Sequence, residues 1–348
     1  MTSPLESVRL DINREIEIML EQQRPLLLEI SPALGPMFSQ VENLLQGGKR
    51  LRPLFGYCGM RVAGGEWSVL NAKALTSLEF LQACALIHDD VMDDSKMRRG
   101  NLAVHEYFKE MHSTQSLRGN AYLYGIGSAI LLGDLCLSWA DELLMKATDF
   151  SSDVKELWDI TRTELMAGQY LDLFAQSSLE PDTALIDSVI TYKSAKYSVE
   201  RPMHLGAALV RRDLMLEQTL SAYAIPLGKA FQLRDDVLGV FGDEIETGKP
   251  SGDDIREGKY TMLISLALAN SSETESEKLK SLLGKQALTE SDIAVARELL
   301  QQRALPEVEA HVEKLTIEAQ NIVDTLETDT ETKELMGQLI VMATARKQ

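Results

Sequence analysis

The sequence predicts an all-α protein. Apolar residues recur three or four positions apart over long stretches, which is the spacing of one helix face; Leu70, Ala74, Leu78, Leu81 and Ala85 form such a series within residues 67–93. No segment alternates apolar and polar residues for more than a few positions, and no repeated Asn-Gly or Asp-Gly pairs mark hairpins. The same helical period is found in residues 154–175, 185–211, 216–241, 291–303 and 306–326.

Breaks between these helices predict how the chain is organised. They fall near residues 31–36, 62–66, 95–101, 177–183 and 242–258. The last break contains GDEIETGKPSGDDIREGK, and a loop of that length inside a compact domain is usually functional or disordered. Since no internal repeat or interdomain linker stands out, we expect a single domain over residues 1–348. Its acidic, less apolar part, from about 270 to 348, should form outer helices.

Composition and charge exclude several classes of protein. The 348 residues are 45% apolar and 25% charged, as in soluble globular proteins, and the net charge of −18 argues against binding to nucleic acid or to an anionic membrane. Cys58, Cys84 and Cys136 form no CxxC pair, so we expect neither a disulfide framework nor a structural zinc site. We predict a cytoplasmic protein without a signal peptide or an integral membrane segment, because the charge-free run 119–133 is short and rich in glycine.

The segment LIHDDVMDDSKMRRG, residues 86–100, is the first candidate site. On a helix, Asp89 and Asp93 are i and i+4, so their carboxylates project from one face about 6 Å apart along the axis. Such a pair suits Mg²⁺ that bridges to phosphate oxygens, and Arg98 and Arg99 could hold those oxygens bidentately. A solvated acidic helix end is the alternative. The largely apolar face leading into Asp89 favours a site.

A second pair of aspartates occurs in FQLRDDVLGVFGD, residues 231–243. Asp235 and Asp236 end an apolar helical segment and precede a loop that contains Lys249 and Lys259. Two neighbouring aspartates are common, so this pattern alone is weak. Two such pairs, each at the end of an apolar helix and each followed by basic residues, suggest acidic walls that hold more than one metal ion around a diphosphate.

Two further segments supply basic residues. In GGKRLRP, residues 47–53, two glycines let backbone amides approach an anion beside Lys49, Arg50 and Arg52, although an exposed basic turn explains this segment equally well. In TYKSAKYSVERPMHLGA, residues 191–207, Lys193 and Ser194 lie in the middle of a helix. This lysine is either a snorkelling surface residue or a cation directed at a leaving group.

Taken together, five segments in this order resemble the trans-isoprenyl diphosphate synthases over about residues 40–265. They are GGKRLRP, LIHDDVMDDSKMRRG, GQYLDL, YKSAK and FQLRDDVLGVFGDEIETGKPSGDDIREGK. The resemblance implies an isoprenoid synthase helix bundle around a deep central cavity, usually a homodimer, with the two aspartate-rich motifs facing each other across the mouth.

The resemblance also implies roles for individual residues. Asp89, Asp93 and Asp235 would hold Mg²⁺, with more than one ion per site, and with Lys193 and Lys259 they would form the catalytic set. The residues implied for isopentenyl diphosphate are Gly48, Lys49, Arg52, Gln82 and Arg99. Those implied for the allylic diphosphate are Arg98, Lys193, Ser194, Gln232, Lys249 and Lys259.

The implied reaction is a head-to-tail prenyl transfer. Cations neutralise the departing diphosphate so that the allylic C–O bond ionises, and such preorganised charge is usually the largest catalytic contribution. The isopentenyl double bond then attacks, and the proton is lost to the diphosphate. One position departs from the family pattern: Gly239 stands where a third aspartate is expected. Either Asp243 substitutes for it, or two carboxylates suffice.

Residues below the first aspartate motif predict the length of the product. Cys84 and Ala85 are small and lie one turn before Asp89, whereas aromatic residues there stop elongation in farnesyl-forming relatives. Leu81 and Leu78 would form the floor one turn further, ~5.4 Å along the helix. We therefore expect geranylgeranyl diphosphate, with a longer polyprenyl or a farnesyl product as alternatives. A non-catalytic regulatory subunit would have lost carboxylates of the first motif, and a terpene cyclase would lack GGKRLRP.

Overall fold

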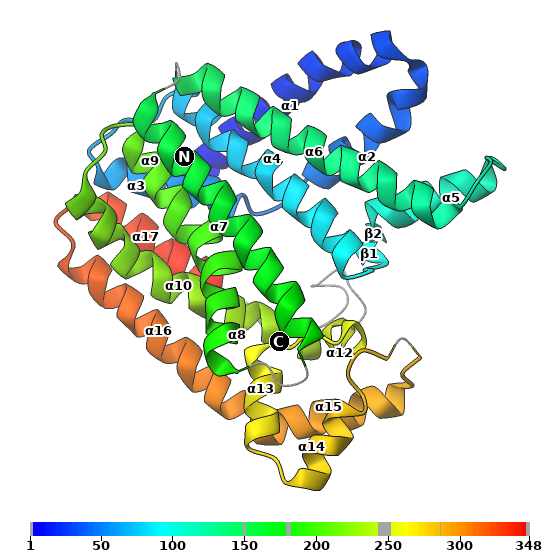
Figure 1. Cartoon of the computed structure of the whole chain (residues 1–348). Coiled ribbons are helices and arrows are strands. Elements are labelled where there is room, and N and C mark those ends of the chain that lie inside the picture. The colour runs from blue at the N-terminus through cyan, green and yellow to red at the C-terminus, as the bar shows by residue number, and fades with distance from the viewer. Residues whose placement is uncertain (1–2, 149–150, 179–181, 243–251, 286, 346–348) are drawn as a thin grey trace. The chain divides into compact units, whose positions relative to one another are not determined.

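The computed structural model of the chain describes residues 3–148, 151–178, 182–242, 252–285 and 287–345. Helices account for nearly all of its regular structure, so the all-α prediction is confirmed (Figure 1). The contacts divide the chain into two compact units, each described separately below: Met1–Asp159 with Pro202–Glu217, and Ile160–Arg201 with Gln218–Gln348. That the whole chain forms a single domain stays a prediction.

The first unit is built around two long helices that pack against each other, α4 (Val69–Met92) and α6 (Ala121–Thr148) (Figure 1). α4 begins at a proper cap, because the Ser68 side chain accepts a hydrogen bond from the backbone N–H of Asn71. The unit also contains α1 (Pro4–Ile30), the 3₁₀ turn η1 (Pro32–Leu34), α2 (Gly35–Leu45), α3 (Leu51–Val62), strands β1 (Met97–Arg98) and β2 (Asn101–Leu102), α5 (Val104–Thr114), the start of α7 (Ser152–Ser177), most of α9 (Arg201–Ala208) and the start of α10 (Leu214–Phe241).

Helix α6 is longer than the sequence suggested. The charge-free run 119–133 continues as helix to Thr148, and these 28 residues are long and apolar enough to cross a membrane by length and composition alone. A core helix of a soluble protein passes the same test, and one face of α6 is packed against α4. The other face keeps large apolar side chains exposed, among them Leu123 and Leu131.

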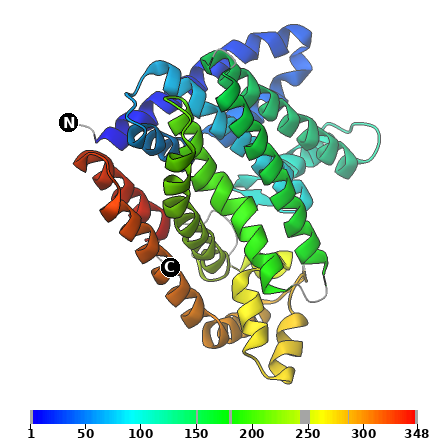
Figure 2. The same ribbon diagram turned by 60° about the vertical axis from the view of Figure 1, so that its left-hand side comes forward.

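The second unit contains most of α7 and α10, and its core forms along α10. Leu233, Val237 and Val240 of α10 pack with Ile255 and Leu263. The remaining elements are α8 (Thr183–Val189), the π-helix η2 (Ile190–Glu200), α12 (Asp253–Glu257), α13 (Met262–Ala269), α14 (Glu273–Lys280), α15 (Glu290–Arg303), α16 (Leu305–Thr325) and α17 (Thr330–Thr344). The last two pack side by side (Figure 2).

The C-terminal helices contribute to this core as well as covering it. Ile293, Leu300 and Val308 are almost completely buried in the same cluster as the apolar residues of α10. Two of these helices begin with capping boxes, at Ser272 and Thr289, in which side chain and backbone at the helix start exchange hydrogen bonds. The acidic composition of residues 270–348 therefore belongs to the outward faces of helices whose inner faces are apolar.

Two glycines allow the π-helix to lie close to its neighbours. A Cβ on Gly168 of α7 would lie 2.4 Å from the backbone nitrogen of Lys193, and a Cβ on Gly228 of α10 would lie 2.5 Å from the Cα of Ala195. Glycine inside a helix costs up to ~1 kcal/mol relative to alanine, so the close backbone approach is the reason for both. Close packing against the backbone of Lys193 therefore explains the glycine at residue 168.

Candidate active site

Two carboxylates lie one above the other at the C-terminal end of α4. The backbone N–H of Asp93 donates to the carbonyl oxygen of Asp89 at 2.9 Å, which fixes the two residues one turn apart on the same face. The helix end carries a partial negative charge of its own, so the site concentrates negative potential. The two residues thus share one helix face, and that they hold a metal ion stays a prediction.

The other two aspartates of the motif are paired with basic residues. Asp90 is buried, and its two carboxylate oxygens accept from Nε of Arg98 at 2.9 and 3.1 Å. Asp94 lies 2.8 Å from Nζ of Lys96. Asp89 also lies near Arg98, with 3.6 Å between its Oδ2 and Nη2 of the arginine. The four carboxylates therefore have different environments, and Arg98 pairs with Asp90, while its predicted role in binding the allylic diphosphate stays a prediction.

A two-residue hairpin presents Arg98 and Arg99. Strands β1 and β2 pair Met97 with Leu102 and Arg98 with Asn101. The turn residues Arg99 and Gly100 both have positive φ, 53° and 76°, as a type I′ turn requires. A positive φ is unfavourable for arginine, and such strain is typical of functional sites. The sequence analysis expected no hairpin here, because Arg-Gly is not among the usual hairpin pairs.

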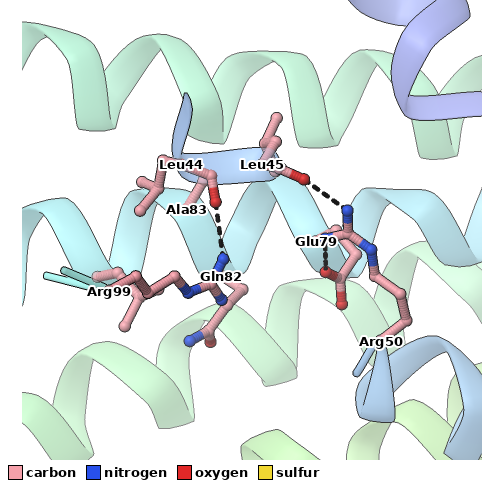
Figure 3. A pocket seen from close by; sticks show the side chains of 8 residues that line it. Leu44, Leu45, Arg50, Glu79, Gln82, Ala83 and Arg99 are labelled. Atoms are coloured by element: carbon pink, nitrogen blue, oxygen red, sulfur yellow. Dashed lines mark hydrogen bonds and ion pairs between the residues drawn. The ribbon is translucent and has the colours of Figure 1, made fainter. Parts of the chain in front are cut away.

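Arg50 and Arg99 line a small pocket in the first unit (Figure 3). Arg99 donates from Nη1 to the carbonyl oxygen of Leu44 at 2.8 Å, and Gln82 lines the pocket beside it. A Cβ on Gly48 would lie 3.8 Å from Nη2 of Arg99, so the GGKRLRP segment lies against the same guanidinium. The structure thus brings together Gly48, Gln82 and Arg99, three of the five residues predicted to bind isopentenyl diphosphate.

The electrostatics of this pocket favour an anion. Burial lowers the pKa of Arg99, and the positive charges of Arg50, Arg98 and Arg52 lower it further, against the opposing effect of Glu79. Arginines repel each other in this way only when their charges are close together. Lys49, from the same segment, is exposed. A diphosphate would relieve the repulsion and gain several charge-assisted hydrogen bonds.

Arg50 plays a part that the sequence analysis did not assign to it. Its guanidinium is buried and donates to Glu79 at 2.7 Å, to Asn13 at 2.9 Å and to the carbonyl oxygen of Leu45 at 2.5 Å. Its backbone has a φ of 54°. Because Arg50 stands between Lys49 and the start of α3, these contacts fix the basic segment on α1, α2 and α4. Two arginines in one short motif give no sequence signal of which one is buried.

The second unit holds a chain of hydrogen bonds that starts on the π-helix. Nζ of Lys193 donates to Asp172 of α7 at 2.5 Å, and the neighbouring Ser194 donates from its hydroxyl to the amide oxygen of Gln232 at 2.5 Å. The amide nitrogen of Gln232 donates to Asp236 at 2.7 Å. Lys193, Ser194 and Gln232, all predicted to bind the allylic diphosphate, therefore lie next to the second aspartate motif.

Four carboxylates gather around this motif. Burial raises the pKa of Asp236 to about 8, against the hydrogen bond from Gln232, and the negative charges of Asp254, Asp235 and Asp172 raise it further. Mg²⁺ and Ca²⁺ prefer oxygen ligands such as these carboxylates, and a bound ion would remove the repulsion between them. The sequence analysis named Asp235 as a ligand and left Asp172 and Asp254 without a role, although GQYLDL and the glycine-rich loop were both singled out.

Lys259 lies between α12 and α13. Its ammonium lies 2.9 Å from Glu257 and 3.9 Å from Asp254, and its backbone N–H donates to the carbonyl oxygen of Asp254 at 3.0 Å. Lys249 and Asp243, also named from the sequence, lie outside the described residues.

A further group of possible metal ligands lies just past the first motif. The ligand atoms of Asp94, His105 and Glu106 all lie within 4.8 Å of one another. The ammonium of Lys96 already bridges them, 2.8 Å from Asp94 and 3.2 Å from Glu106. Burial lowers the pKa of His105. A lysine therefore neutralises this group, which the sequence analysis did not recognise because its members are spread over two elements.

The residues predicted to set product length differ in burial. Leu81 and Cys84 are fully buried in the first unit, and Sγ of Cys84 lies 3.7 Å from Nδ1 of His88. Ala85 is partly exposed. The role of these residues in limiting product length stays a prediction.

Comparison with known proteins identifies the family. The family model for polyprenyl synthetase matches residues 37–300, about three quarters of the chain. The chain belongs to the polyprenyl synthetase family. The family condenses isopentenyl diphosphate with allylic diphosphates, and this member is a trans-type prenyltransferase. The resemblance drawn from the five motifs is confirmed.

Individual relatives agree with the family. The chain is 32% identical over 265 residues to a geranylgeranyl diphosphate synthase of Saccharolobus solfataricus, covering 74% of each chain. It is 31% identical over 280 residues to a short chain isoprenyl diphosphate synthase of Methanothermobacter thermautotrophicus, covering 79% of this chain and 80% of that one. The crystal structure of geranylgeranyl pyrophosphate synthase from Corynebacterium glutamicum, complexed with isoprenyl diphosphate and magnesium, superimposes with a TM-score of 0.93 at 34% identity, covering 99% of both chains.

Proposed function

We propose that the chain is a Mg²⁺-dependent geranylgeranyl diphosphate synthase that acts in the cytoplasm as a homodimer. The observation that carries the proposal is the arrangement around the end of α4. The carboxylates of Asp89 and Asp93 stand one turn apart there, and the same unit holds a small pocket lined by Arg50 and Arg99, here called the arginine pocket. A cation site and an anion site in one compact unit are what a reaction between two diphosphates requires.

The carboxylates present fit the metal that the family uses. Asp89 and Asp93 offer oxygen ligands on one helix face. In the second unit Asp236 lies close enough to Asp254, Asp235 and Asp172 for their negative charges to add to the effect of burial in raising its pKa. Asp89, Asp93 and Asp235 would hold the ions. Bound Mg²⁺ supplies positive charge that stabilises the departing diphosphate. The relative from Corynebacterium glutamicum was crystallised with magnesium, which supports this assignment.

Separate sets of residues would bind the two substrates. Arg99 and Gln82, with Gly48, Lys49 and Arg52, would bind the diphosphate of isopentenyl diphosphate in the arginine pocket. The residues that would bind the allylic diphosphate are Arg98, Lys193, Ser194, Gln232, Lys249 and Lys259.

These residues also account for the chemistry. Lys193 and the hydroxyl of Ser194 would donate to diphosphate oxygens and stabilise the leaving group as the allylic C–O bond breaks. The double bond of isopentenyl diphosphate then attacks the allylic carbon, and the released diphosphate takes the proton. No side-chain base is needed for this last step.

The length of the product is proposed from α4. Cys84 and Ala85 lie one turn before Asp89, and both are small; Leu81 and Leu78 follow one turn further and are fully buried. A growing chain would therefore pass the first turn and stop at the leucines. Relatives that make geranylgeranyl diphosphate support a twenty-carbon product.

The proposals for assembly and location rest on other features. Exposed apolar residues on α6, including Leu123, Ile130 and Leu131, offer a face that a second copy of the chain would cover. The three cysteines are free and buried, as expected in a reducing compartment.

The test of the function is turnover of labelled isopentenyl diphosphate with Mg²⁺ and an allylic primer. Replacing Asp89 by alanine removes one carboxylate of the cation site and relieves repulsion, so we expect an intact fold with turnover lowered by a factor of about 10³ or more. Glu110→Ala, which removes an exposed carboxylate from α5, should leave turnover unchanged. Turnover of Asp89→Ala close to that of the unchanged protein would refute the cation site.

A further inference from the structure

The second aspartate motif lacks a carboxylate where its family pattern has a third one. Gly239 lies on α10, one turn after Asp235, so a side chain there would project from the same helix face. The space is filled from another element. A Cβ built on Gly239 would lie 1.9 Å from Oδ2 and 2.5 Å from Cγ of Asp254. The carboxylate of Asp254 thus occupies the position that a side chain at residue 239 would take.

The position of Asp254 is fixed by its surroundings. It belongs to α12, a short helix bounded by Gly252 and Gly258, whose φ angles are +78° and +74°. The next residue, Ile255, is fully buried, and its carbonyl oxygen accepts from the backbone N–H of Gly284 at 3.0 Å. Its side chain belongs to the apolar core of the second unit. The neighbouring Ile255 therefore holds Asp254 in place, through a backbone hydrogen bond to Gly284 and through its side chain in the apolar core.

Asp254 also lies beside the second aspartate motif. Its carboxylate meets α10 at Gly239, one turn after Asp235. Nζ of Lys259 lies 3.9 Å from Oδ1 of Asp254. Carboxylates that share a site repel each other, and a divalent cation bound between them removes that repulsion.

We propose that Asp254 supplies the third carboxylate of the second acidic wall and acts toward Mg²⁺ in place of the missing side chain at Gly239. The inference rests on the proposed function and deepens it. It also assigns a reason to the glycine: a side chain at residue 239 would displace the carboxylate that replaces it. Asp243 is then not required as the substitute.

Binding of Mn²⁺ in the presence of inorganic pyrophosphate tests the proposal without turnover, because bound Mn²⁺ is counted by electron paramagnetic resonance. Asp254→Asn keeps the shape of the side chain and removes its charge, so we expect Mn²⁺ affinity to fall about tenfold or more. Asp253→Asn, which removes the neighbouring carboxylate of the same short helix, is the matched control and should bind Mn²⁺ like the unchanged protein.

Gly239→Ala provides an independent arm. The added Cβ meets the end of a flexible side chain, and alanine favours the helix, so the unfolding temperature should stay the same or rise. Mn²⁺ affinity should nevertheless fall as in Asp254→Asn, because the carboxylate is displaced. The double variant should lose no more affinity than either single variant, since both changes remove the same ligand. Gly239→Asp combined with Asp254→Gly should recover affinity.

Two outcomes would overturn the proposal. One is an Asp254→Asn variant that binds Mn²⁺ as tightly as the unchanged protein. The other is a Gly239→Ala effect that is equally large with asparagine at residue 254. The proposed function is judged separately, by formation of prenyl product from the unchanged protein; lack of product would refute the function, whereas Mn²⁺ titration of the variants judges Asp254.

Discussion

At the scale of single residues, the site depends on side chains that hold others in place. Arg50 illustrates this: it is buried, takes an unfavourable backbone conformation and is satisfied by Glu79, Asn13 and a backbone carbonyl. Removing one partner of a buried ion pair leaves a charge without compensation, which is more costly than losing the pair as a whole. The ion pair between Arg50 and Glu79 therefore helps to hold the segment that contains Lys49 and Arg52 in place.

Glu79→Gln tests this dependence. The amide cannot neutralise Arg50, so we expect the free energy of unfolding to fall by about 3 kcal/mol. Urea denaturation followed by circular dichroism measures the change. As a control, Asp159→Asn removes a partner of Lys155 on a solvent-facing part of α7 and should cost less than about 1 kcal/mol. Equal effects of the two substitutions would contradict a special role for Arg50.

The cysteines allow a pH-dependent prediction. Burial raises the pKa of Cys58 and Cys84 from 9.0 to about 12 and raises that of Cys136 as well. At pH 8 the folded protein should therefore react with Ellman's reagent only very slowly, and all three thiols should react in denaturant. Since the folded state holds its thiol protons more tightly, stability should fall as pH rises above 9. Rapid labelling of the native protein at pH 8 would show that a thiol is accessible.

The sequence predicted which side chains lie close together only where both belong to the same helix. The spacing of Asp89 and Asp93 predicted their common face, because both belong to α4. The pairing of Asp90 with Arg98 depends on the turn directly after α4, where Asp94 has a φ of 51° and the backbone N–H of Ser95 donates to the carbonyl oxygen of Asp90. Asp254 reaches Gly239 across a gap of fifteen positions, and neither residue signals the other.

At the scale of elements, the π-helix positions Lys193, the lysine proposed to act on the leaving diphosphate. Its eleven residues, Ile190–Glu200, are unusually long for this kind of helix. Glu164 of α7 holds its end, accepting from Lys196 at 2.8 Å and from Arg201 at 2.6 Å. Gly168 of α7 meets it at the backbone of Lys193. The element is thus fixed by one buried charge cluster and by close backbone packing.

Gly168→Ala should disturb this packing. The added methyl would lie 2.4 Å from a backbone nitrogen, which cannot yield as a side-chain end can, so we expect a loss of about 1–3 kcal/mol in unfolding free energy. Turnover should fall as well, because Lys193 moves. Gly337→Ala on α17 is the control: nothing lies within 4 Å of its Cβ, and the change should be neutral or stabilising. Thermal unfolding and steady-state kinetics of both variants decide the matter.

The elements themselves were largely predictable, and their irregularities were not. The spacing of apolar residues predicted helices where α4, α7 and α10 occur. The segment ITYKSAKYSVE was predicted as part of an ordinary helix, and its apolar residues gave no sign that it forms a π-helix. The β1–β2 hairpin was missed because its strands have two residues each.

At the scale of the whole molecule, the exposed apolar face of α6 predicts an assembly. Leu123 and Leu131 are 64% and 63% exposed, which is unfavourable in water unless another surface covers them. Sedimentation equilibrium should therefore give about twice the 38.7 kDa mass of the chain. Leu131→Asp should shift the protein toward the monomer. Val341→Asp, a change at a residue 60% exposed on α17, should leave the mass unchanged, and a monomeric unchanged protein would contradict the assembly.

The most direct measurement is the product spectrum of the purified chain with labelled isopentenyl diphosphate, Mg²⁺ and separate five-, ten- and fifteen-carbon allylic primers. A dominant twenty-carbon product from each accepted primer is the predicted result, because Cys84 and Ala85 let the chain pass one turn of α4 and the buried Leu81 and Leu78 stop it. Longer products would show that the floor lies elsewhere. A chain that forms no product with any primer would contradict the account as a whole.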